Sequence, residues 1–277
     1  MIILILLLLI IIVYLFLIAP ATNKDLSAFK GRYYAHRGLH DNKGDAPENS
    51  MKAYKKALDK AYGMEFDVHL SKDSVPVLCH DFTLERMYRD DKGEPVKGKI
   101  YDYTLEELRQ FHLLDTDERI PLLKDVLEMV DGKVPLIIEL KIESANKDLS
   151  ICEIVSDMLK DYKGLYCIES FDPRIVYWFR KHEPDTVRGQ LSEDYHREEP
   201  DRYKGLLYFA LAYLMGNFLT KPDFIAYNHH NEDNLSRRLC HKLFRNTAVA
   251  YTIKSQEELE RHRKNFDIFI LDSFIPE

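Results

Sequence analysis

Acidic residues occupy alternating positions in segments that are predicted to be strands. Glu65 and Asp67 stand two apart, so both side chains point to one face of a strand. Glu139 and Lys141 repeat this spacing directly after the apolar run 134–138. Each carboxylate alone suits an ion pair or a helix cap, but carboxylates that are confined together need a neutralising partner. The three together favour a site for a hard divalent cation, Mg²⁺ or Ca²⁺.

Two histidines follow predicted strands and are suited to proton transfer. His36 ends the first predicted strand, and His80 follows the short apolar run 75–79. Cleavage of a phosphodiester needs a base for the nucleophile and an acid for the leaving oxygen, and an imidazole does either near neutral pH. A structural hydrogen bond is the alternative for each histidine alone. Arg37 and Lys141 could pair with phosphate oxygens or with the carboxylates.

Alternating strands and helices are predicted to position these residues. After residue 31, short apolar runs alternate with amphipathic segments, as in parallel β–α–β units. About 250 residues suffice for eight such units, so we predict an α/β fold, a (β/α)₈ TIM barrel over residues 32–277. Glu139 then lies near the carboxyl end of a buried strand, where parallel barrels carry their active sites. The polar segment 82–104 is interpreted as an insertion over one face.

The amino-terminal segment carries no charge before Lys24. Residues 1–20 are predicted to form a transmembrane helix, because about 18 helical residues span roughly 27 Å of a hydrocarbon core of roughly 30 Å. A cleaved signal peptide is the alternative, although no basic residue precedes the apolar run. We expect a single-pass membrane protein in which residues 21–31 form a short tether.

Membrane orientation and partners follow from charge. Lys24, Lys30 and Arg32 come after the apolar segment, which favours a cytoplasmic barrel, with an exported enzyme as the alternative. The net charge of −7 argues against nucleic acid as a partner. The four cysteines form no C-x-x-C pair, which argues against a zinc knuckle.

Three features in the second half of the chain, an apolar segment, a histidine pair and a tyrosine, each lead to a separate prediction. The mostly apolar segment 203–219 resembles a second membrane span, but its place between predicted barrel strands favours a covering helix. His229 and His230 suggest a metal site, but a solvated loop after a strand is the favoured interpretation. Tyr251 is a candidate for lining a pocket.

The order of the short motifs resembles the glycerophosphodiester phosphodiesterase family. Weaker similarity extends towards the carboxyl terminus, so the resemblance covers nearly everything after residue 31. Tyr251 stands where the family often has tryptophan. The ordered motifs are His36-Arg37-Gly38, Glu48-Asn49, Glu65-x-Asp67, His80-Asp81 and Glu139-x-Lys141.

The resemblance implies a (β/α)₈ barrel that hydrolyses glycerophosphodiesters to glycerol 3-phosphate and an alcohol with a divalent metal. It also implies acidic metal ligands, a pair of histidines as acid and base, and basic phosphate contacts. These are the metal ligands Glu65, Asp67 and Glu139, the catalytic His36 and His80, the phosphate-binding Arg37 and Lys141, and the supporting Glu48, Asn49 and Asp81.

Two alternative functions stay open. The first is a lysophospholipase D-like lipase, which the predicted membrane helix suggests and whose substrate would be a lysophospholipid rather than a water-soluble diester. A catalytically silent phospholipid-binding barrel is the other alternative. The presence of both histidines and every proposed ligand argues against it.

Overall fold

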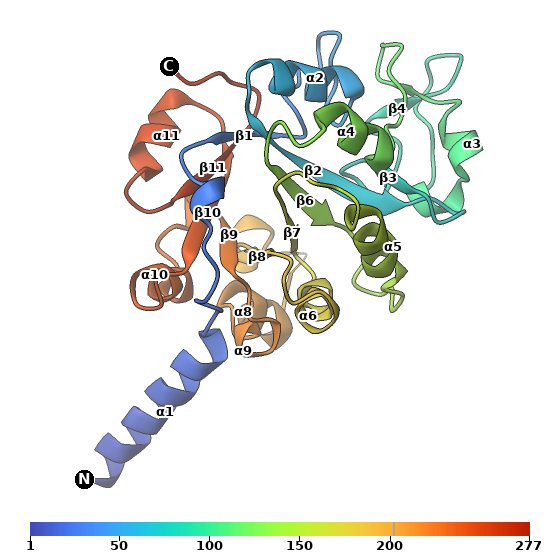
Figure 1. Ribbon diagram of the computed structural model, residues 1–277. Coiled ribbons are helices and arrows are strands. Elements are labelled where there is room, and N and C mark those ends of the chain that lie inside the picture. Colours follow the sequence, from blue (N-terminus) through green and yellow to red (C-terminus); the bar gives the residue numbers. More distant parts are fainter. Residues whose placement is uncertain (202) are drawn as a thin grey trace.

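Eight parallel strands close into a barrel in the computed structural model, which describes residues 1–201 and 203–277 (Figure 1). β1 pairs with both β2 and β11, and this pairing closes the sheet. The predicted TIM barrel is therefore confirmed. In order around the barrel the strands are β1 (Tyr33–His36), β2 (Gly63–Leu70), β6 (Leu136–Leu140), β7 (Tyr166–Ser170), β8 (Arg188–Ser192), β9 (Phe224–Asn228), β10 (Thr247–Ile253) and β11 (Ile268–Leu271).

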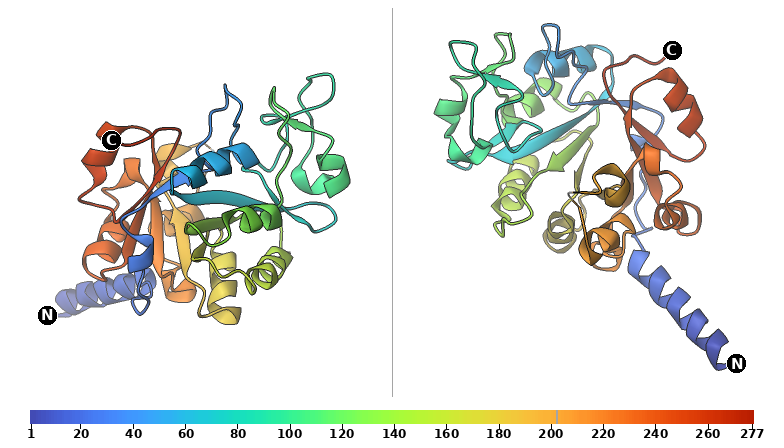
Figure 2. Two further views of the ribbon diagram at one scale, coloured as in Figure 1. Left: turned by 45° about the horizontal axis from the view of Figure 1, so that its top comes forward. Right: turned by 180° about the vertical axis from the view of Figure 1, so that it is seen from behind.

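Helices cover the outside of the barrel, as the alternating pattern predicts (Figures 1 and 2). Ser50 begins α2 by accepting a hydrogen bond from the backbone N–H of Ala53, and Asp172 caps α6 with Pro173 in its first turn. The helices that follow barrel strands are α2 (Met51–Asp59), α4 (Leu123–Val130), α5 (Ser150–Leu159), α6 (Pro173–His182), α10 (Leu235–Lys242) and α11 (Gln256–His262).

The alternation of side chains along each strand separates the outer core from the barrel interior. On β6, Ile138 and Leu140 pack with the covering helices in one apolar cluster. Ile137 belongs to a different cluster, which fills the barrel interior. Glu139 lies two residues further along β6 and therefore on the same inward face as Ile137.

The insertion folds around a small core of its own. β3 (Pro76–Leu78), which the sequence suggests as a member of the strand series, pairs antiparallel with β2 and lies outside the closed barrel. The unit beyond it buries side chains such as Leu84 and Ile100. Its other elements are β4 (Tyr88–Arg89), the 3₁₀ helix η2 (Ile100–Asp102), α3 (Leu105–Leu108) and β5 (His112–Leu113).

Three short helices lie between β8 and β9, and the last two of them replace the single covering helix that was expected over residues 203–219. α7 (Tyr195–Glu198) is followed by α8 (Leu206–Ala212) and α9 (Asn217–Thr220). The Tyr227 hydroxyl of β9 donates to the carbonyl oxygen of Ala212 at 2.8 Å, which holds the end of α8 on the barrel. The segment lies on the outside of the barrel, as the sequence suggests.

Helix α1 (Ile2–Ile18) projects away from the barrel (Figures 1 and 2). It has 17 residues, and its last turn packs on the protein, where Ile18 is fully buried and the Tyr14 hydroxyl lies 2.6 Å from Ser236 Oγ. Among the residues that the structure describes, no helix has both the length and the apolar character needed to cross a membrane. The prediction of a transmembrane helix over residues 1–20 is therefore not supported.

Residues 21–31, expected as a tether, lie against the amino-terminal end of the barrel. The Lys24 ammonium donates to the carbonyl oxygens of Pro184 and Thr186 at 2.6 and 2.7 Å. Leu26 and Phe29 are buried in the interior cluster, the latter within the 3₁₀ helix η1 (Ser27–Phe29). The segment thus closes this end of the barrel.

Candidate active site

Neighbouring barrel strands place carboxylates in one buried layer. Asp67 of β2 is in register with Glu139 of β6, which is in register with Glu169 of β7. Glu65 lies one inward position earlier on β2. One oxygen from each of Glu65, Asp67 and Glu139 lies within 4.8 Å of the others, and each of these residues is at most 7% exposed. The structure therefore brings the three predicted metal ligands together.

The pKa values of this layer show an excess of negative charge. Burial, followed by repulsion from Asp67, raises the pKa of Glu65 well above its usual range. Burial also raises the pKa of Glu139 to about 7, although Lys141 opposes this rise. Burial acts to raise the pKa of Asp67 too, but Lys141 and other cations outweigh it and hold that pKa well below its usual range.

The donor set fits a divalent cation. Lys141 Nζ lies 3.1 Å from Asp67 Oδ1 and 3.2 Å from Glu139 Oε1, which compensates only part of the charge. Asp67 Oδ1 is buried and, apart from this ion pair with Lys141, has no hydrogen-bond partner in the described part of the chain. Clustered carboxylate oxygens with spare lone pairs are typical ligands of Mg²⁺ and Ca²⁺. Glu65, Asp67 and Glu139 would hold such an ion.

Glu169 is a fourth carboxylate that the sequence analysis missed. It is 1% exposed, and its Oε2 has no hydrogen-bond partner within residues 1–201 and 203–277. Burial, with repulsion from Glu139 next, raises its pKa well above the usual range. Glu169 follows a short apolar run just as Glu139 does, so the same pattern could have found it.

His36 faces the carboxylates from the end of β1. Its Nε2 lies 3.9 Å from Glu65 Oε2, and its Nδ1 lies 4.0 Å from an oxygen of Asp272, the first residue after β11. Burial and then the neighbouring Arg37 lower the pKa of His36 well below its usual range, so the ring is neutral at pH 7. Asp272 also accepts a hydrogen bond from His40 Nε2 at 3.0 Å, and the sequence analysis assigned neither residue to the site.

His80 approaches from the loop after β3 and is oriented by acidic and basic neighbours. Its Nδ1 donates to Asp81 Oδ1 at 2.6 Å, so Nε2 takes no part in this hydrogen bond. Arg86 donates both to Asp81 Oδ2 at 2.5 Å and to Glu48 Oε1 at 2.6 Å. Burial, followed by Lys141, lowers the pKa of His80. Arg86 lies in the polar insertion, where nothing in the sequence distinguishes it from its charged neighbours.

The loop after β1 ties the remaining predicted residues to the carboxylates. Arg37 Nη1 donates to Glu48 Oε1 at 2.7 Å, and its Nε lies 3.5 Å from Asp67 Oδ2. Asn49 donates to Asp67 Oδ2 at 3.0 Å and accepts from the Tyr54 hydroxyl at 2.6 Å. Burial would raise the pKa of Glu48, but its partners Arg86 and Arg37 lower it to about 2. Glu48 and Asn49 thus orient the residues that face the site.

Tyr251 lies on β10, which is separated from β1 by β11 alone in the barrel order. Its hydroxyl donates to the carbonyl oxygen of Ser192 at 2.8 Å, and its ring meets the Phe171 ring edge-on at 5.9 Å between centroids. The hydroxyl is therefore engaged by the barrel wall, and the ring is the part that could face a substrate.

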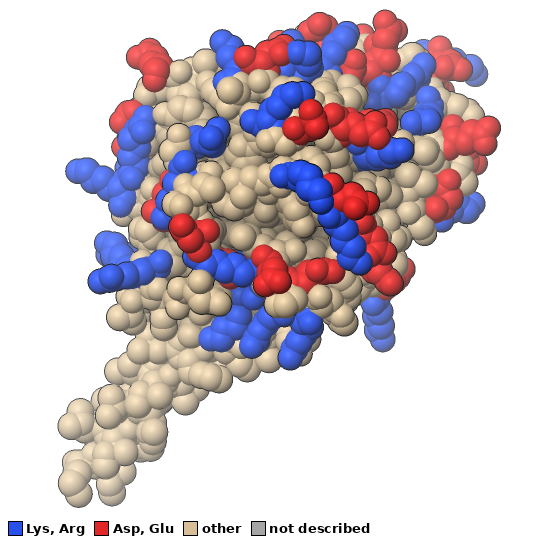
Figure 3. All heavy atoms as spheres, in the orientation of Figure 1, with Lys and Arg blue, Asp and Glu red and all other residues tan. Residues whose placement is uncertain are grey.

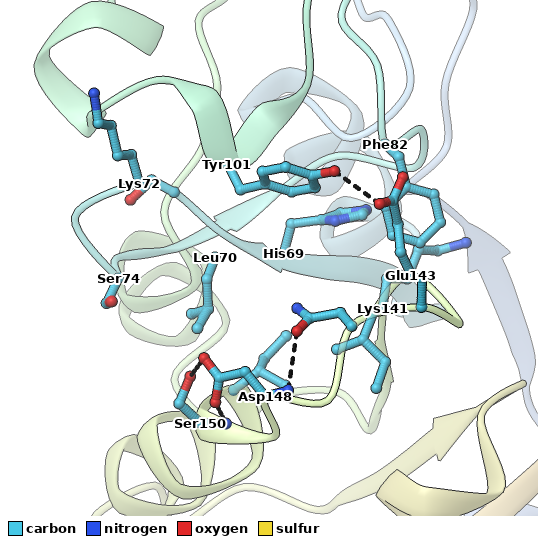
Figure 4. A pocket seen from close by; sticks show the side chains of 15 residues that line it. His69, Leu70, Lys72, Ser74, Phe82, Tyr101, Lys141, Glu143, Asp148 and Ser150 are labelled. Atoms are coloured by element: carbon cyan, nitrogen blue, oxygen red, sulfur yellow. Dashed lines mark hydrogen bonds between the residues drawn. The ribbon is translucent and has the colours of Figure 1, made fainter.

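A cavity of about 500 Å³ adjoins the carboxylate layer (Figure 4). Lys141 and His69 line it from the barrel, and Phe82 and Tyr101 line it from the insertion. The Tyr101 hydroxyl donates to Glu143 at 2.7 Å across the rim. Lys141 thus contacts both the cavity and the carboxylates. The insertion provides a wall of the cavity, as its predicted position over one face suggests.

Comparison with known proteins identifies the family. Residues 36–265 match the glycerophosphoryl diester phosphodiesterase family. The chain belongs to this family. The family resemblance inferred from the ordered motifs is therefore confirmed.

Sequence relatives of this family member include a bacterial glycerophosphodiester phosphodiesterase and a mammalian lysophospholipase D. A glycerophosphodiester phosphodiesterase of Bacillus altitudinis is 31% identical over 182 residues, which are 62% of this chain and 70% of that protein. A lysophospholipase D of Rattus norvegicus is 32% identical over 148 residues, 49% of this chain and 43% of that one. The chain spans about half the length of the mammalian relatives that it matches.

Solved structures share the fold of this family member. A phosphodiesterase of Oleispira antarctica, determined in complex with the product sn-glycerol-3-phosphate, superimposes with a TM-score of 0.66. The two chains are 21% identical, and the match covers 88% of this chain and 93% of the other. This likeness establishes the barrel fold, while the chemistry rests on the site itself.

Proposed function

We propose that the protein is a metal-dependent phosphodiesterase that hydrolyses glycerophosphodiesters to glycerol 3-phosphate and an alcohol. The observation that supports this most is the meeting of two imidazoles, from His36 and His80, with buried carboxylates at the carboxyl end of the barrel strands. Family membership and the product bound to the Oleispira antarctica phosphodiesterase point to the same chemistry.

The charged residues around the carboxylates are suited to a phosphodiester. A divalent cation bound by Glu65, Asp67 and Glu139 supplies electrostatic stabilisation of the charge that develops on the phosphate. Arg37 and Lys141 lie beside the same carboxylates and can pair with non-bridging phosphate oxygens. The diester is thereby held where both histidines reach it.

The two histidines carry out the proton transfers in this mechanism. One takes the proton from the attacking hydroxyl or water, and the other gives a proton to the leaving oxygen. The lowered pKa values of His36 and His80 keep a neutral base available at pH 7. The negative charge of the bound diester raises the pKa of whichever ring must act as the acid. Asp81 fixes the His80 ring so that Nε2 faces the reaction.

The cavity beside Lys141 is the proposed site for the part of the substrate beyond the phosphate. Its volume suits a small polar molecule, and its walls combine the aromatic rings of Phe82 and Tyr101 with the carboxylate of Glu143 (Figure 4). Such a surface accepts a headgroup that has both apolar and charged parts.

A hydrolysis panel tests this function. Turnover of glycerophosphocholine and other diesters is measured with Mg²⁺, with Ca²⁺ and after thorough chelation, in wild type, His80→Ala and the exposed-histidine control His182→Ala. We expect metal-dependent turnover in wild type and the control only. Full activity after chelation would refute the metal role, and a folded protein that turns over no diester would support the silent barrel.

A lysophospholipase D activity is the second candidate. It is supported by the similarity to the rat lysophospholipase D and by the apolar surface of α1. Comparing kcat/KM for lysophosphatidylcholine and glycerophosphocholine separates the two activities. A higher value for the lysolipid would make the lipase the main function.

We also propose that α1 attaches the enzyme to a membrane surface. Every side chain from Ile2 to Val13 is apolar and at least 51% exposed. Figure 3 shows both charge signs over the globular part of this face and none on the projecting helix. Large exposed apolar surfaces mark sites of contact with a partner or a bilayer. Vesicle co-sedimentation should be strong for wild type and weak for Leu7→Asp, and equal sedimentation of both would contradict the proposal.

A further inference from the structure

A second group of potential metal ligands lies at a different part of the barrel rim. His229 and His230 belong to the 3₁₀ helix η3 (His229–Asn231) after β9, and Glu258 lies in the first turn of α11 after β10. One ligand atom from each lies within 4.8 Å of the others. The sequence analysis favoured a solvated loop for the two histidines, but His229 is only 3% exposed. The burial of His229 is inconsistent with a solvated loop and indicates a role within the fold.

The hydrogen bond of His229 defines its protonation. Its Nδ1 lies 3.1 Å from the carbonyl oxygen of Tyr251, and because a carbonyl only accepts, Nδ1 carries the proton. In the neutral ring, Nε2 then bears an unshared electron pair. Nε2 is buried and has no hydrogen-bond partner in the described part of the chain. A histidine held by a carbonyl on one nitrogen and open on the other has the usual arrangement of a metal ligand.

An ion pair between a protonated His229 and Glu258 is the alternative explanation. The distance from Nε2 to Glu258 Oε2 is 3.7 Å, which is too long for a hydrogen bond. Two electron-rich atoms therefore face each other across a gap that a cation would bridge.

The surroundings orient the other potential ligands. Glu258 Oε2 accepts from the backbone N–H of Lys254 at 2.7 Å, which fixes the carboxylate. The His262 ring lies 4.9 Å from the His229 ring and donates through Nδ1 to Glu232 at 2.7 Å, so it is engaged elsewhere. His230 is exposed, which leaves one side of the group open to solvent.

We propose that His229, His230 and Glu258 bind a transition-metal ion of the zinc class, with water in the fourth position. Two imidazoles and one carboxylate form a borderline ligand set that suits Zn²⁺. This set differs from the all-oxygen set of the carboxylate layer, which suits a hard cation. A bound ion would join the turn after β9 to α11 beside the backbone of Tyr251.

Zinc titration of the untagged, metal-stripped full chain tests the proposal. Competition with a chromophoric chelator gives the affinity of wild type, His230→Ala and Glu258→Gln. His182→Ala and Glu257→Gln are matched controls, since both residues are exposed and lie outside the group. We expect the two ligand variants to lose about tenfold or more in zinc affinity at one site and the controls to match wild type.

Zinc-edge X-ray absorption supplies the second readout. Wild type should show two imidazole nitrogens on the ion at this site, and His230→Ala should show one fewer. The tested residues are at least partly exposed, so thermal unfolding of the metal-free variants should resemble that of wild type. Zinc binding that is unchanged in both variants, or a zinc ion bound through oxygen alone, would overturn the proposal and leave Glu258 as a helix-end hydrogen-bond acceptor.

Discussion

The two ends of the barrel interior are made from the same strands but differ in chemistry. On β6, Ile137 belongs to the apolar interior cluster, and Glu139, the next inward residue, belongs to the carboxylate layer. On β7, Cys167 and Glu169 repeat this change in register. Phe29 seals the apolar end, whereas the charged end adjoins the cavity.

The apolar end of the barrel interior therefore contributes mainly to stability, and the charged end contributes the residues of the site. Full burial of a large apolar side chain stabilises a fold by about 1.5–3 kcal/mol, so the apolar end contributes stability. At the other end, the raised pKa values of Glu65, Glu139 and Glu169 show that burial and mutual repulsion disfavour the charged forms. The fold tolerates this charged layer because the opposite end and the helices secure the strands.

The largest expected effect is on turnover, at the charged end. Removing the imidazole in His80→Ala, and separately in His36→Ala, should lower kcat by about 10²–10⁴-fold, because a proton transfer is lost. The free energy of unfolding should change little in His80→Ala, whose ring is partly exposed. Kinetics on glycerophosphocholine and urea unfolding measure the two quantities. A variant that retains wild-type turnover would remove that histidine from the mechanism.

A substitution at the apolar end should lower stability and leave turnover unchanged. Phe29→Ala empties part of the interior cluster and should cost about 3–5 kcal/mol of unfolding free energy while the folded fraction keeps its kcat. Leu207→Ala, at a side chain that is 67% exposed, is the control and should change stability by less than about 0.5 kcal/mol. Selective loss of turnover in Phe29→Ala would show that the two ends are not independent.

The carboxylate layer should make metal-free stability depend on pH. The pKa of Glu139 is raised from 4.5 to about 7, so between these values the native state holds a proton that the unfolded state has lost. Unfolding free energy should therefore fall as pH rises through this window. Glu139→Gln should flatten the fall and stabilise the metal-free protein by about 1–3 kcal/mol at pH 8. A steeper decline in the variant would contradict the assigned direction.

The smallest expected effect concerns Tyr251. Its hydroxyl donates to the Ser192 carbonyl, so Tyr251→Phe should cost about 0.5–1.5 kcal/mol of stability and leave kcat within a few-fold. Thermal unfolding and turnover measured side by side test this. A large rise in KM without loss of stability would instead place the hydroxyl on the substrate.

The barrel could be predicted from sequence because strands and helices alternate along the chain. Most of the carboxylate layer could be predicted because inward and outward side chains alternate along each strand. Glu65, Asp67 and Glu139 stand at inward positions near strand ends, and parallel strands bring such positions together. Glu169 obeys the same rule, since it follows a short apolar run and lies in register with Glu139. Arg86 could not be found, because its contacts with Asp81 and Glu48 depend on how the insertion folds back.

The amino-terminal region shows where local patterns do not suffice. The apolar run led to a transmembrane helix, but Ile18 is buried against the protein and the helix ends there. The tether prediction rested on the polarity of residues 21–31, whereas the structure inserts Leu26 and Phe29 into the barrel end. The position of both segments depends on packing against residues that are far away in the sequence. Hydropathy averaged over a short window carries no information about that packing.

The most direct test of the carboxylate layer is the thermal stability of the protein as Mg²⁺, Ca²⁺ or Mn²⁺ is titrated into the metal-free form. A ligand that binds only the native state raises Tm with its concentration. We predict such a rise in wild type with at least one of these ions, and its loss in Glu139→Gln despite that variant's higher starting Tm. An equal rise in both proteins, or none in wild type with any ion, would contradict a divalent site at Glu65, Asp67 and Glu139.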